Sequence, residues 1–465
     1  MKQTHAPLSI GHLNLPIYIL VLLNLCLPGR SVAQTATSLY QNVVSGISCA
    51  PSQNGTGHLV CGAERQIPGG AATLFSGASY QARPTTAIPP EPVATVHTLD
   101  VQMASGPITS TPGCAFTGDG SGAIVCAVEG PNNGLYGVSI HPQPTQKALP
   151  LLPLLLPGAI IPFSHGFGSG IFGDAPCNPG GPCNVNNIFI GLAAAPSCAA
   201  AGQGETVICG VVAVMQNTKG AAVTGFIGVS FDPNVGATSV IVKNYPFMPT
   251  AQTNPTCTND TDHNTTTNTN GGVTFAVCAL VPVNNTPWSS ANVGLVAFDP
   301  RSTYQRGSLN IFSSTSFASD PSCATPRDGT TEIICAIVVG SGVGNTIVGL
   351  GFDPVARTTV SQNLGPAPSG TEAWTSVACA SPNSAQGSQG TIACAATTSL
   401  DQVHALTFDP RVSSLTVNTG NFFSPPSGAA IAGVPSCISL NIVSNQITCA
   451  IVDSTGQAWA FPVPL

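Results

Sequence analysis

Residues 321–354 read PSCATPRDGTTEIICAIVVGSGVGNTIVGLGFDP, and variants of this stretch recur along most of the chain. The stretch holds two cysteines twelve residues apart, an apolar run through the second cysteine, a glycine-rich gap, a second apolar run and Phe-Asp-Pro. Internal repeats of about this length are typical of propellers and other arrays. Seven copies start at the cysteines Cys49, Cys114, Cys198, Cys257, Cys323, Cys379 and Cys437.

Each copy predicts four short strands, because runs of Val, Ile, Ala and Phe are bounded by Gly, Pro and Asn. The second and third runs are almost continuously apolar, as strands buried on both faces are. Neighbouring blades of a propeller supply that burial. We therefore expect an all-β chain that forms one seven-bladed propeller of four-stranded blades. Asp-Pro pairs close the third strand in four copies and are interpreted as turn formers: Asp232, Asp299, Asp353 and Asp409.

The last copy ends at Leu465 after only three predicted strands, while residues 35–44 precede the first copy. We expect this N-terminal segment to supply the fourth strand of the last blade, beside residues 457–461. Such pairing closes the ring and covers both sheet edges.

The cysteine spacing predicts disulfides between neighbours in the sequence, as in an oxidising compartment. Zinc sites usually place paired cysteines two to four residues apart, so we predict no metal ligation. Closing a loop of about twelve residues stabilises a blade by roughly 3 kcal/mol in the chain-entropy model. The predicted pairs are Cys49–Cys61, Cys114–Cys126, Cys177–Cys183, Cys198–Cys209, Cys257–Cys278, Cys323–Cys335, Cys379–Cys394 and Cys437–Cys449.

The first 33 residues have the features of a signal peptide: Lys2, an apolar core over residues 15–27 and small residues before Gln34. Residues 34–465 would then form the propeller in a secreted, periplasmic or cell-surface protein. A lipid anchor at Cys26 is the alternative, but Leu25 is not the small residue expected before it. The apolar stretch over residues 148–163 contains four prolines, so we expect no transmembrane helix.

The charge balance excludes nucleic acid as the main partner. Residues 34–465 carry ten basic and nineteen acidic side chains and no basic run. Nucleic-acid binding requires clustered Lys and Arg that neutralise phosphates. No cofactor motif is placed on a suitable strand or helix, so no cofactor is expected.

The largest departure from the repeat is an insertion over residues 157–187, which contains Cys177 and Cys183. Long loops on repeat scaffolds are often functional, although a tolerated surface insertion is the simpler interpretation. His165 lies in a short His-Gly-Phe-Gly run within the insertion. The chain has no Gly-X-Ser-X-Gly nucleophile motif to accompany it.

Other candidate site residues should lie on the face of the ring that carries this insertion. Glu64, Glu129 and Asp453 follow the second cysteines of the first, second and seventh copies, which are neighbours in a closed ring. Such acids can act as an acid–base pair or remain separate solvated charges. Trp288 and Trp374 should share this face, as sugar-stacking residues or as packing between blades.

The Pro-Ser-Cys starts of the blades and the segment Gly134-Leu135-Tyr136-Gly137 resemble secreted seven-bladed propellers, including tectonin-like and bacterial fucose-binding lectins. This resemblance implies a propeller fold and a carbohydrate-binding role. Those lectins place repeated aromatic residues, often Trp, around each sugar between blades. This chain has only three Trp residues, so the resemblance assigns no sugar-binding residue.

The favoured hypothesis is an exported, non-enzymatic binding or adhesion module for a glycan or protein partner. Fold alone cannot establish this function. One alternative is a hydrolase or lyase that uses Glu64, Glu129, Asp453 and His165. The other is a structural envelope or surface-layer component, which low charge and abundant Ala, Ser, Thr and Gly would suit.

Overall fold

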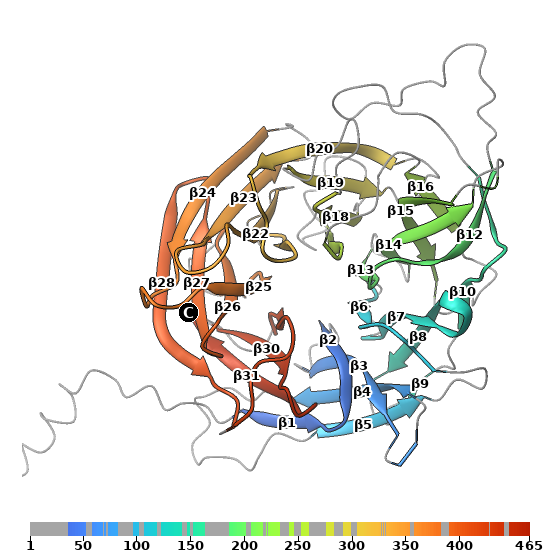
Figure 1. The fold of residues 1–465 in the computed structure, drawn as a ribbon, viewed down its shortest axis with the longest axis horizontal. Helices are drawn as coiled ribbons and strands as arrows, with labels where there is room; N and C mark the ends of the chain where they lie inside the picture. Colours follow the sequence, from blue (N-terminus) through green and yellow to red (C-terminus); the bar gives the residue numbers. More distant parts are fainter. Residues whose placement is uncertain are drawn as a thin grey trace, which may run out of the picture. The chain divides into compact units, whose positions relative to one another are not determined.

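Seven antiparallel sheets follow one another around a ring in the computed structural model (Figure 1), which confirms the predicted all-β propeller. The structure describes residues 36–52, 58–67, 69–70, 73–81, 96–101, 107–118, 122–141, 147–148, 152–162, 186–200, 206–216, 220, 222–232, 241–245, 253–259, 276–282, 292–298, 305–326, 328, 330, 332–353, 358–382, 390–426, 428–440 and 446–465.

Most blades are sheets whose strands run in sequence order from the centre of the ring outward; in blade 7 the outer strand comes from the N-terminal end, and blade 3 carries additional strands that are out of sequence order. Blade 1 contains β2 (Val43–Pro51), β3 (His58–Gln66), β4 (Thr73–Gln81) and β5 (Val96–Val101). Blade 2 contains β6 (Gly113–Phe116), β7 (Ile124–Gly130), β8 (Gly134–His141), β9 (Lys147–Ala148) and β10 (Leu152–Leu155), with the 3₁₀ turn η1 (Pro131–Asn133) between β7 and β8. Blade 3 contains β11 (Ile160–Pro162), β12 (Asn186–Leu192), β13 (Ser197–Ala200), β14 (Val207–Gln216), β15 (Ala222–Phe231) and β16 (Ile241–Tyr245).

The remaining four blades have four strands each. Blade 4 contains β17 (Thr256–Asn259), β18 (Ala276–Leu280), β19 (Asn292–Phe298) and β20 (Gln305–Ser313). Blade 5 contains β21 (Ser322–Ala324), β22 (Ile333–Val339), β23 (Thr346–Asp353) and β24 (Thr358–Pro366). Blade 6 contains β25 (Trp374–Ala380), β26 (Ile392–Thr398), β27 (Val403–Asp409) and β28 (Ser414–Phe423). Blade 7 contains β29 (Ser436–Ile438), β30 (Gln446–Val452), β31 (Ala458–Pro464) and β1 (Thr37–Tyr40).

The ring closes as predicted, because β1 supplies the outer strand of blade 7. It pairs antiparallel with β31, and Thr37 lies opposite Ala460. The Gln457 side chain reinforces the junction by donating hydrogen bonds to Ser38 Oγ at 2.7 Å and to the Tyr40 carbonyl at 2.8 Å. Chain ends that are 417 residues or more apart are thereby held in one sheet.

Seven of the predicted disulfides are present, and each joins the first and second strands of one blade. The two cysteines of each pair lie directly opposite each other in the strand register, as Cys198 and Cys209 do in blade 3. The predicted pair Cys177–Cys183 lies outside the described residues.

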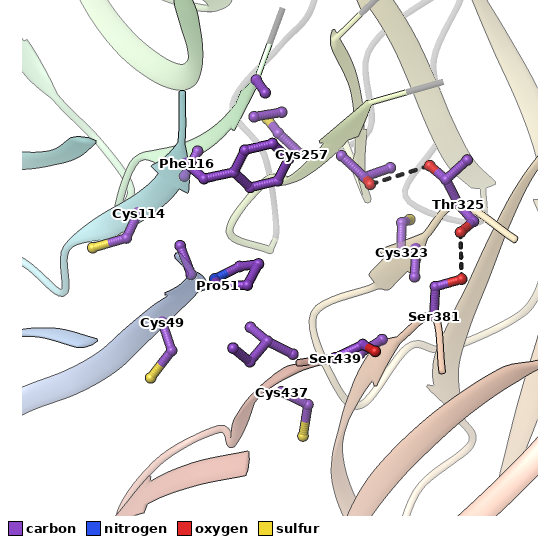
Figure 2. A pocket seen from close by; sticks show the side chains of 18 of the residues that line it. Cys49, Pro51, Cys114, Phe116, Cys257, Cys323, Thr325, Ser381, Cys437 and Ser439 are labelled. Atoms are coloured by element: carbon purple, nitrogen blue, oxygen red, sulfur yellow. Dashed lines mark hydrogen bonds between the residues drawn. The ribbon is translucent and has the colours of Figure 1, made fainter. Parts of the chain in front are cut away.

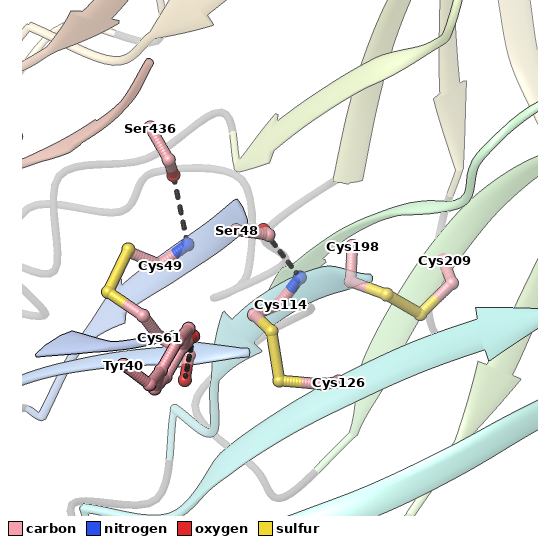
Figure 3. Close-up of a disulfide and its surroundings, with 9 residues drawn as sticks. All are labelled: Tyr40, Ser48, Cys49, Cys61, Cys114, Cys126, Cys198, Cys209 and Ser436. Atoms are coloured by element: carbon pink, nitrogen blue, oxygen red, sulfur yellow. Dashed lines mark hydrogen bonds between the residues drawn. A yellow bond between two sulfur atoms is a disulfide. The ribbon is translucent and has the colours of Figure 1, made fainter. Parts of the chain in front are cut away.

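Serine hydroxyls join neighbouring blades at the centre of the ring (Figure 3). Ser436 Oγ of blade 7 accepts from the Cys49 backbone N–H of blade 1 at 2.9 Å, and Ser48 does the same for Cys114 of blade 2 at 3.0 Å. Ser197 binds the Cys257 N–H and Ser322 binds the Cys379 N–H in the same way. The serine directly before the first cysteine of a blade therefore links that blade to the next one.

The junction between blades 2 and 3 is built differently, because Gly113 replaces the serine. A Cβ atom on Gly113 would overlap the Pro196 carbonyl oxygen and would lie 2.8 Å from the Ser197 Cα. Only glycine allows this close approach of the two backbones.

The predicted insertion over residues 157–187 is partly a continuation of blade 3. Its flanks form β11 and the start of β12, and β12 pairs with the end of β14, where Leu192 lies opposite Ala213. Residues 163–185 lie outside the described part of the chain.

The expected signal peptide also lies outside the residues that the structure describes, which begin at Ala36. Cleavage after Ala33 and export therefore stay predictions. The seven disulfides favour an oxidising environment. Within the described ranges, no helix has the length and apolar character needed to span a membrane.

Candidate functional site

The axis of the ring holds two cavities that meet at its inner disulfides. One has a volume of about 450 Å³ and lies where the inner strands begin; we call it the wide cavity. The other has a volume of about 210 Å³ and lies where these strands end; we call it the narrow cavity. The first cysteines of all seven blades line both cavities, so the two are halves of one axial channel.

Asp320 brings a carboxylate to the wide cavity, directly before the Pro-Ser-Cys segment of blade 5. The equivalent positions in the other blades are uncharged: Gly46, Thr111, Ala195, Asn254, Ser376 and Val434. Asp320 is the only acidic side chain among the described residues that line this cavity.

Asn254 of blade 4 holds the Asp320 carboxylate in place. Its backbone N–H donates to Asp320 Oδ1 and its side-chain amide donates to Oδ2, both at 2.9 Å. Asn254 Oδ1 in turn accepts from the Ala195 N–H of blade 3 at 3.2 Å. Burial raises the pKa of Asp320, and the hydrogen bonds from Asn254 partly oppose this shift. One continuous polar chain therefore links three blades at the rim.

A side cavity of about 290 Å³ adjoins the wide cavity, and Asp320 and Val434 line both. Its wall combines an aromatic ring, Phe317, with hydroxyl-bearing residues from blades 4 to 6. The described hydroxyl residues in this wall are Thr253, Ser319, Thr375 and Ser376. A carboxylate, hydroxyls and an aromatic ring together can bind a ligand that has both polar and apolar faces.

The narrow cavity contains no charged side chain among the described residues that line it. Figure 2 shows Pro51 and Phe116 on one side and Thr325, Ser381 and Ser439 on the other. The Ser381 hydroxyl donates to the Thr325 carbonyl oxygen at 2.5 Å. The cavity is thus divided into an apolar half and a hydroxyl half.

Glu64 and Glu129 lie at the junction of blades 1 and 2, close enough for their charges to interact. Burial raises the pKa of Glu64; hydrogen bonds from Thr73 and Ser45 oppose the shift, and the charge of Glu129 adds to it. Burial also raises the pKa of Glu129, against a hydrogen bond from Thr109. Neither carboxylate lines the axial or side cavities.

Asp453 differs from these two glutamates in its register. Glu64 and Glu129 are three residues after the second cysteine, whereas Asp453 is four residues after it, and strand side chains alternate between faces. Its Oδ1 accepts from the backbone N–H of Thr455 at 2.9 Å, and its Oδ2 accepts from Trp459 Nε1 at 2.8 Å. Burial alone would raise the pKa of Asp453, but these hydrogen bonds outweigh burial and lower it. Asp453 therefore organises its own turn.

Trp374 is 2% exposed and packs between blades 5 and 6. Its backbone N–H donates to Asn345 Oδ1 at 2.8 Å, and its indole Nε1 donates to the Gly365 carbonyl at 3.2 Å. The ring meets His404 edge-on, with centroids 5.8 Å apart. This is the packing role that was the alternative to sugar stacking. His165 and Trp288 lie outside the described residues.

An arginine on the narrow-cavity face binds one carboxylate of its own blade 6 and two carboxylates of blade 5. Arg411 contacts Asp409 at 2.8 Å, Asp328 at 2.7 Å and also Glu332. Burial alone would raise the pKa of Asp328, but hydrogen bonds from Thr330 and Arg411 outweigh it and lower the pKa. Asp409, one of the predicted Asp-Pro turn residues, thus also orients Arg411, which makes the salt bridges to blade 5.

In the part of the chain that is described, no group of three or more His, Cys, Asp or Glu side chains is placed to hold a metal ion.

Asp320 was not among the predicted site residues, because the acids predicted from the sequence all come shortly after the second cysteine of a copy. The signal that could have found it is the residue before Pro-Ser-Cys, where an acid occurs in one blade only.

Solved structures with a similar fold include a lectin, BP39L from Burkholderia pseudomallei, with 11% identity and a TM-score of 0.52 over 91% of this chain and 97% of that one. AofleA from Arthrobotrys oligospora matches at 8% identity and a TM-score of 0.43, covering 83% and 90% of the two chains. An α-L-arabinanase from Penicillium chrysogenum, solved with arabinobiose, matches at 8% identity and a TM-score of 0.39, covering 92% and 98%.

The BP39L match confirms the predicted resemblance to propeller lectins at the level of the fold. No family model matches the sequence, and no curated protein matches it significantly.

Proposed function

We propose that this chain is an exported, non-enzymatic binding or adhesion module that recognises a glycan or protein partner at the wide cavity. The observation that carries the proposal is the position of Asp320 between two adjoining cavities of about 450 and 290 Å³. Ligand sites are typically concave and have few polar groups that fix orientation.

The lining of these cavities favours a glycan over a protein segment. Sugars present hydroxyls that can donate to the Asp320 carboxylate and exchange hydrogen bonds with Thr375 and Ser376. The C–H face of a sugar can pack against an aromatic ring such as Phe317, which is half-buried at the wall of the side cavity. A glycan can therefore use both types of surface at once.

Glycan-array binding by the purified wild-type protein and the Asp320→Asn variant tests this proposal. The variant keeps the size of the side chain but removes the charge and places an amide donor against Asn254, so we expect at least a tenfold loss of affinity. Thr111→Val distinguishes loss of the carboxylate from loss of a rim contact, because Thr111 also lines the wide cavity and its Oγ1 accepts the Gly46 N–H at 2.8 Å as the equivalent contact of blade 2. Unchanged binding by Asp320→Asn would reject the wide cavity as the site.

A hydrolase or lyase is the second candidate, favoured by the raised pKa values of both Glu64 and Glu129. A carboxyl group with a raised pKa can remain protonated and act as a general acid. Release of reducing ends or unsaturated products from a polysaccharide panel tests for this activity. Activity that Glu129→Gln abolishes would support the enzyme; no product with wild type would count against it.

A further inference from the structure

The side chains that line the narrow cavity are apolar in one half of the ring and carry hydroxyl groups in the other half. The residue two positions after the inner cysteine lines it in six blades. In blades 1 to 3 it is apolar, and in blades 5 to 7 it carries a hydroxyl: Pro51, Phe116 and Ala200, then Thr325, Ser381 and Ser439. The Phe116 ring points from the apolar side toward the hydroxyl side (Figure 2).

Among the described hydroxyl residues of this lining, only Ser439 has an oxygen without a hydrogen-bond partner. It is only 5% exposed, and its Oγ has no hydrogen-bond partner in the described structure. A buried hydroxyl without a partner loses its hydrogen bonds to water and gains none in return. The Ser439 Oγ has almost no accessible surface, so a ligand hydroxyl in the cavity would become its partner once the side chain rotates toward the cavity.

The size and neutrality of the cavity restrict the ligand further. Its volume of about 210 Å³ is below the roughly 300 Å³ where pockets for drug-sized molecules begin. It is far above the ~10–15 Å³ that one water molecule needs. Without a charged lining residue among those described, the cavity offers nothing to balance the burial of an ionic ligand.

We propose that the narrow cavity is a second binding site, separate from the wide cavity, for a small uncharged polyol with one apolar face, such as a single pyranose ring. The apolar face packs against Phe116 and Pro51. The hydroxyl edge meets Ser381 and Ser439, whose hydroxyls each offer lone pairs as acceptors. This site does not depend on Asp320 or on the ligand of the wide cavity.

Saturation-transfer NMR and titration calorimetry with methyl pyranosides test this site. We expect Ser439→Ala to weaken binding about fivefold, the effect of one hydrogen bond. Phe116→Ala should weaken it by a similar or larger factor. Ser139→Ala is the matched control, because Ser139 is also 5% exposed with an unpartnered Oγ but lies on β8, outside this cavity.

A variant that blocks the wide cavity distinguishes pyranoside binding in the narrow cavity from binding in the wide cavity. Gly433 lines the wide cavity, and a Cβ there would meet only the Gly46 Cα, at 4.0 Å, so Gly433→Phe places a large ring in that cavity without a backbone clash. Pyranoside binding that survives Gly433→Phe and weakens in Ser439→Ala supports the proposal. The proposal is overturned if no pyranoside binds to wild type, if Ser439→Ala behaves like Ser139→Ala, or if Gly433→Phe alone abolishes binding.

Discussion

The Ser436 hydroxyl accepts a hydrogen bond from the Cys49 backbone N–H at 2.9 Å, although the two residues are 387 positions apart. This bond joins blade 7 to blade 1 at the axis, while β1 joins the same ends of the chain at the outer edge. The ring is therefore closed from both sides of its last blade.

Ser436→Ala should lower the free energy of unfolding by about 1 kcal/mol, because the Cys49 N–H loses its partner. Ser439→Ala is the control on the adjoining segment, since Ser439 Oγ has no partner to lose. Urea denaturation of both variants measures the difference. Equal stability of the two variants would show that the bond between blades contributes nothing.

Gly113→Ala should be among the most destabilising small substitutions in the chain, with a loss of about 3 kcal/mol from overpacking. The new methyl group would meet the backbone at Pro196 and Ser197, which cannot move as a flexible side chain can. Gly370→Ala is the control, because a Cβ there has no neighbour within 4 Å. Similar melting temperatures for both variants would contradict the close approach of blades 2 and 3.

Arg411→Met should destabilise the protein by about 2 kcal/mol near pH 7, because it leaves three carboxylates without their cation. The lowered folded-state pKa of Asp328 means that its ionised form stabilises the fold above the unfolded pKa of about 3.9. This contribution is lost as the pH falls through the folded-state pKa. Urea unfolding at pH 7 and pH 3 should therefore show a smaller loss in acid; an equal loss at both pH values would argue against the salt-bridge cluster.

Glu64→Gln and Glu129→Gln should stabilise the fold at pH 8 but not at pH 4. The folded-state pKa of each glutamate is raised, so each contributes stability below its unfolded pKa that is lost as the pH rises through the folded pKa. Glutamine remains neutral and avoids this loss. Thermal unfolding from pH 4 to pH 8 measures the effect, and stabilisation that does not grow with pH would refute the raised pKa values.

The fold was predictable because its determinants are repeated in the sequence. The spacing of Cys323 and Cys335 recurs with little change, and each copy predicts the same hairpin and disulfide. Ring closure could be inferred by counting strands, because the last copy has only three strands and its blade needs a fourth strand from the N-terminal end of the chain. The link between Ser436 and Cys49 was not predictable in this way, because it depends on how adjacent blades approach each other.

The candidate site was harder to predict, because it is made of departures from the repeat. Asp453 was grouped with Glu64 and Glu129 by proximity to a cysteine, but a shift of one residue in a strand reverses the direction of its side chain. Trp374 was considered for ligand stacking, and its burial depends on contacts with Asn345 of another blade. Asp320 became a candidate only when the cavities around it were known.

Binding of the partner at the wide cavity is tested most directly by a glycan array probed with labelled wild-type protein and the Gly433→Phe variant. Circular dichroism and thermal unfolding would establish that the variant is folded. We expect wild type to bind a subset of glycans and Gly433→Phe to lose binding to all of them, except single pyranose units held by the narrow cavity. Undiminished binding of larger glycans by the folded variant would contradict binding at the wide cavity.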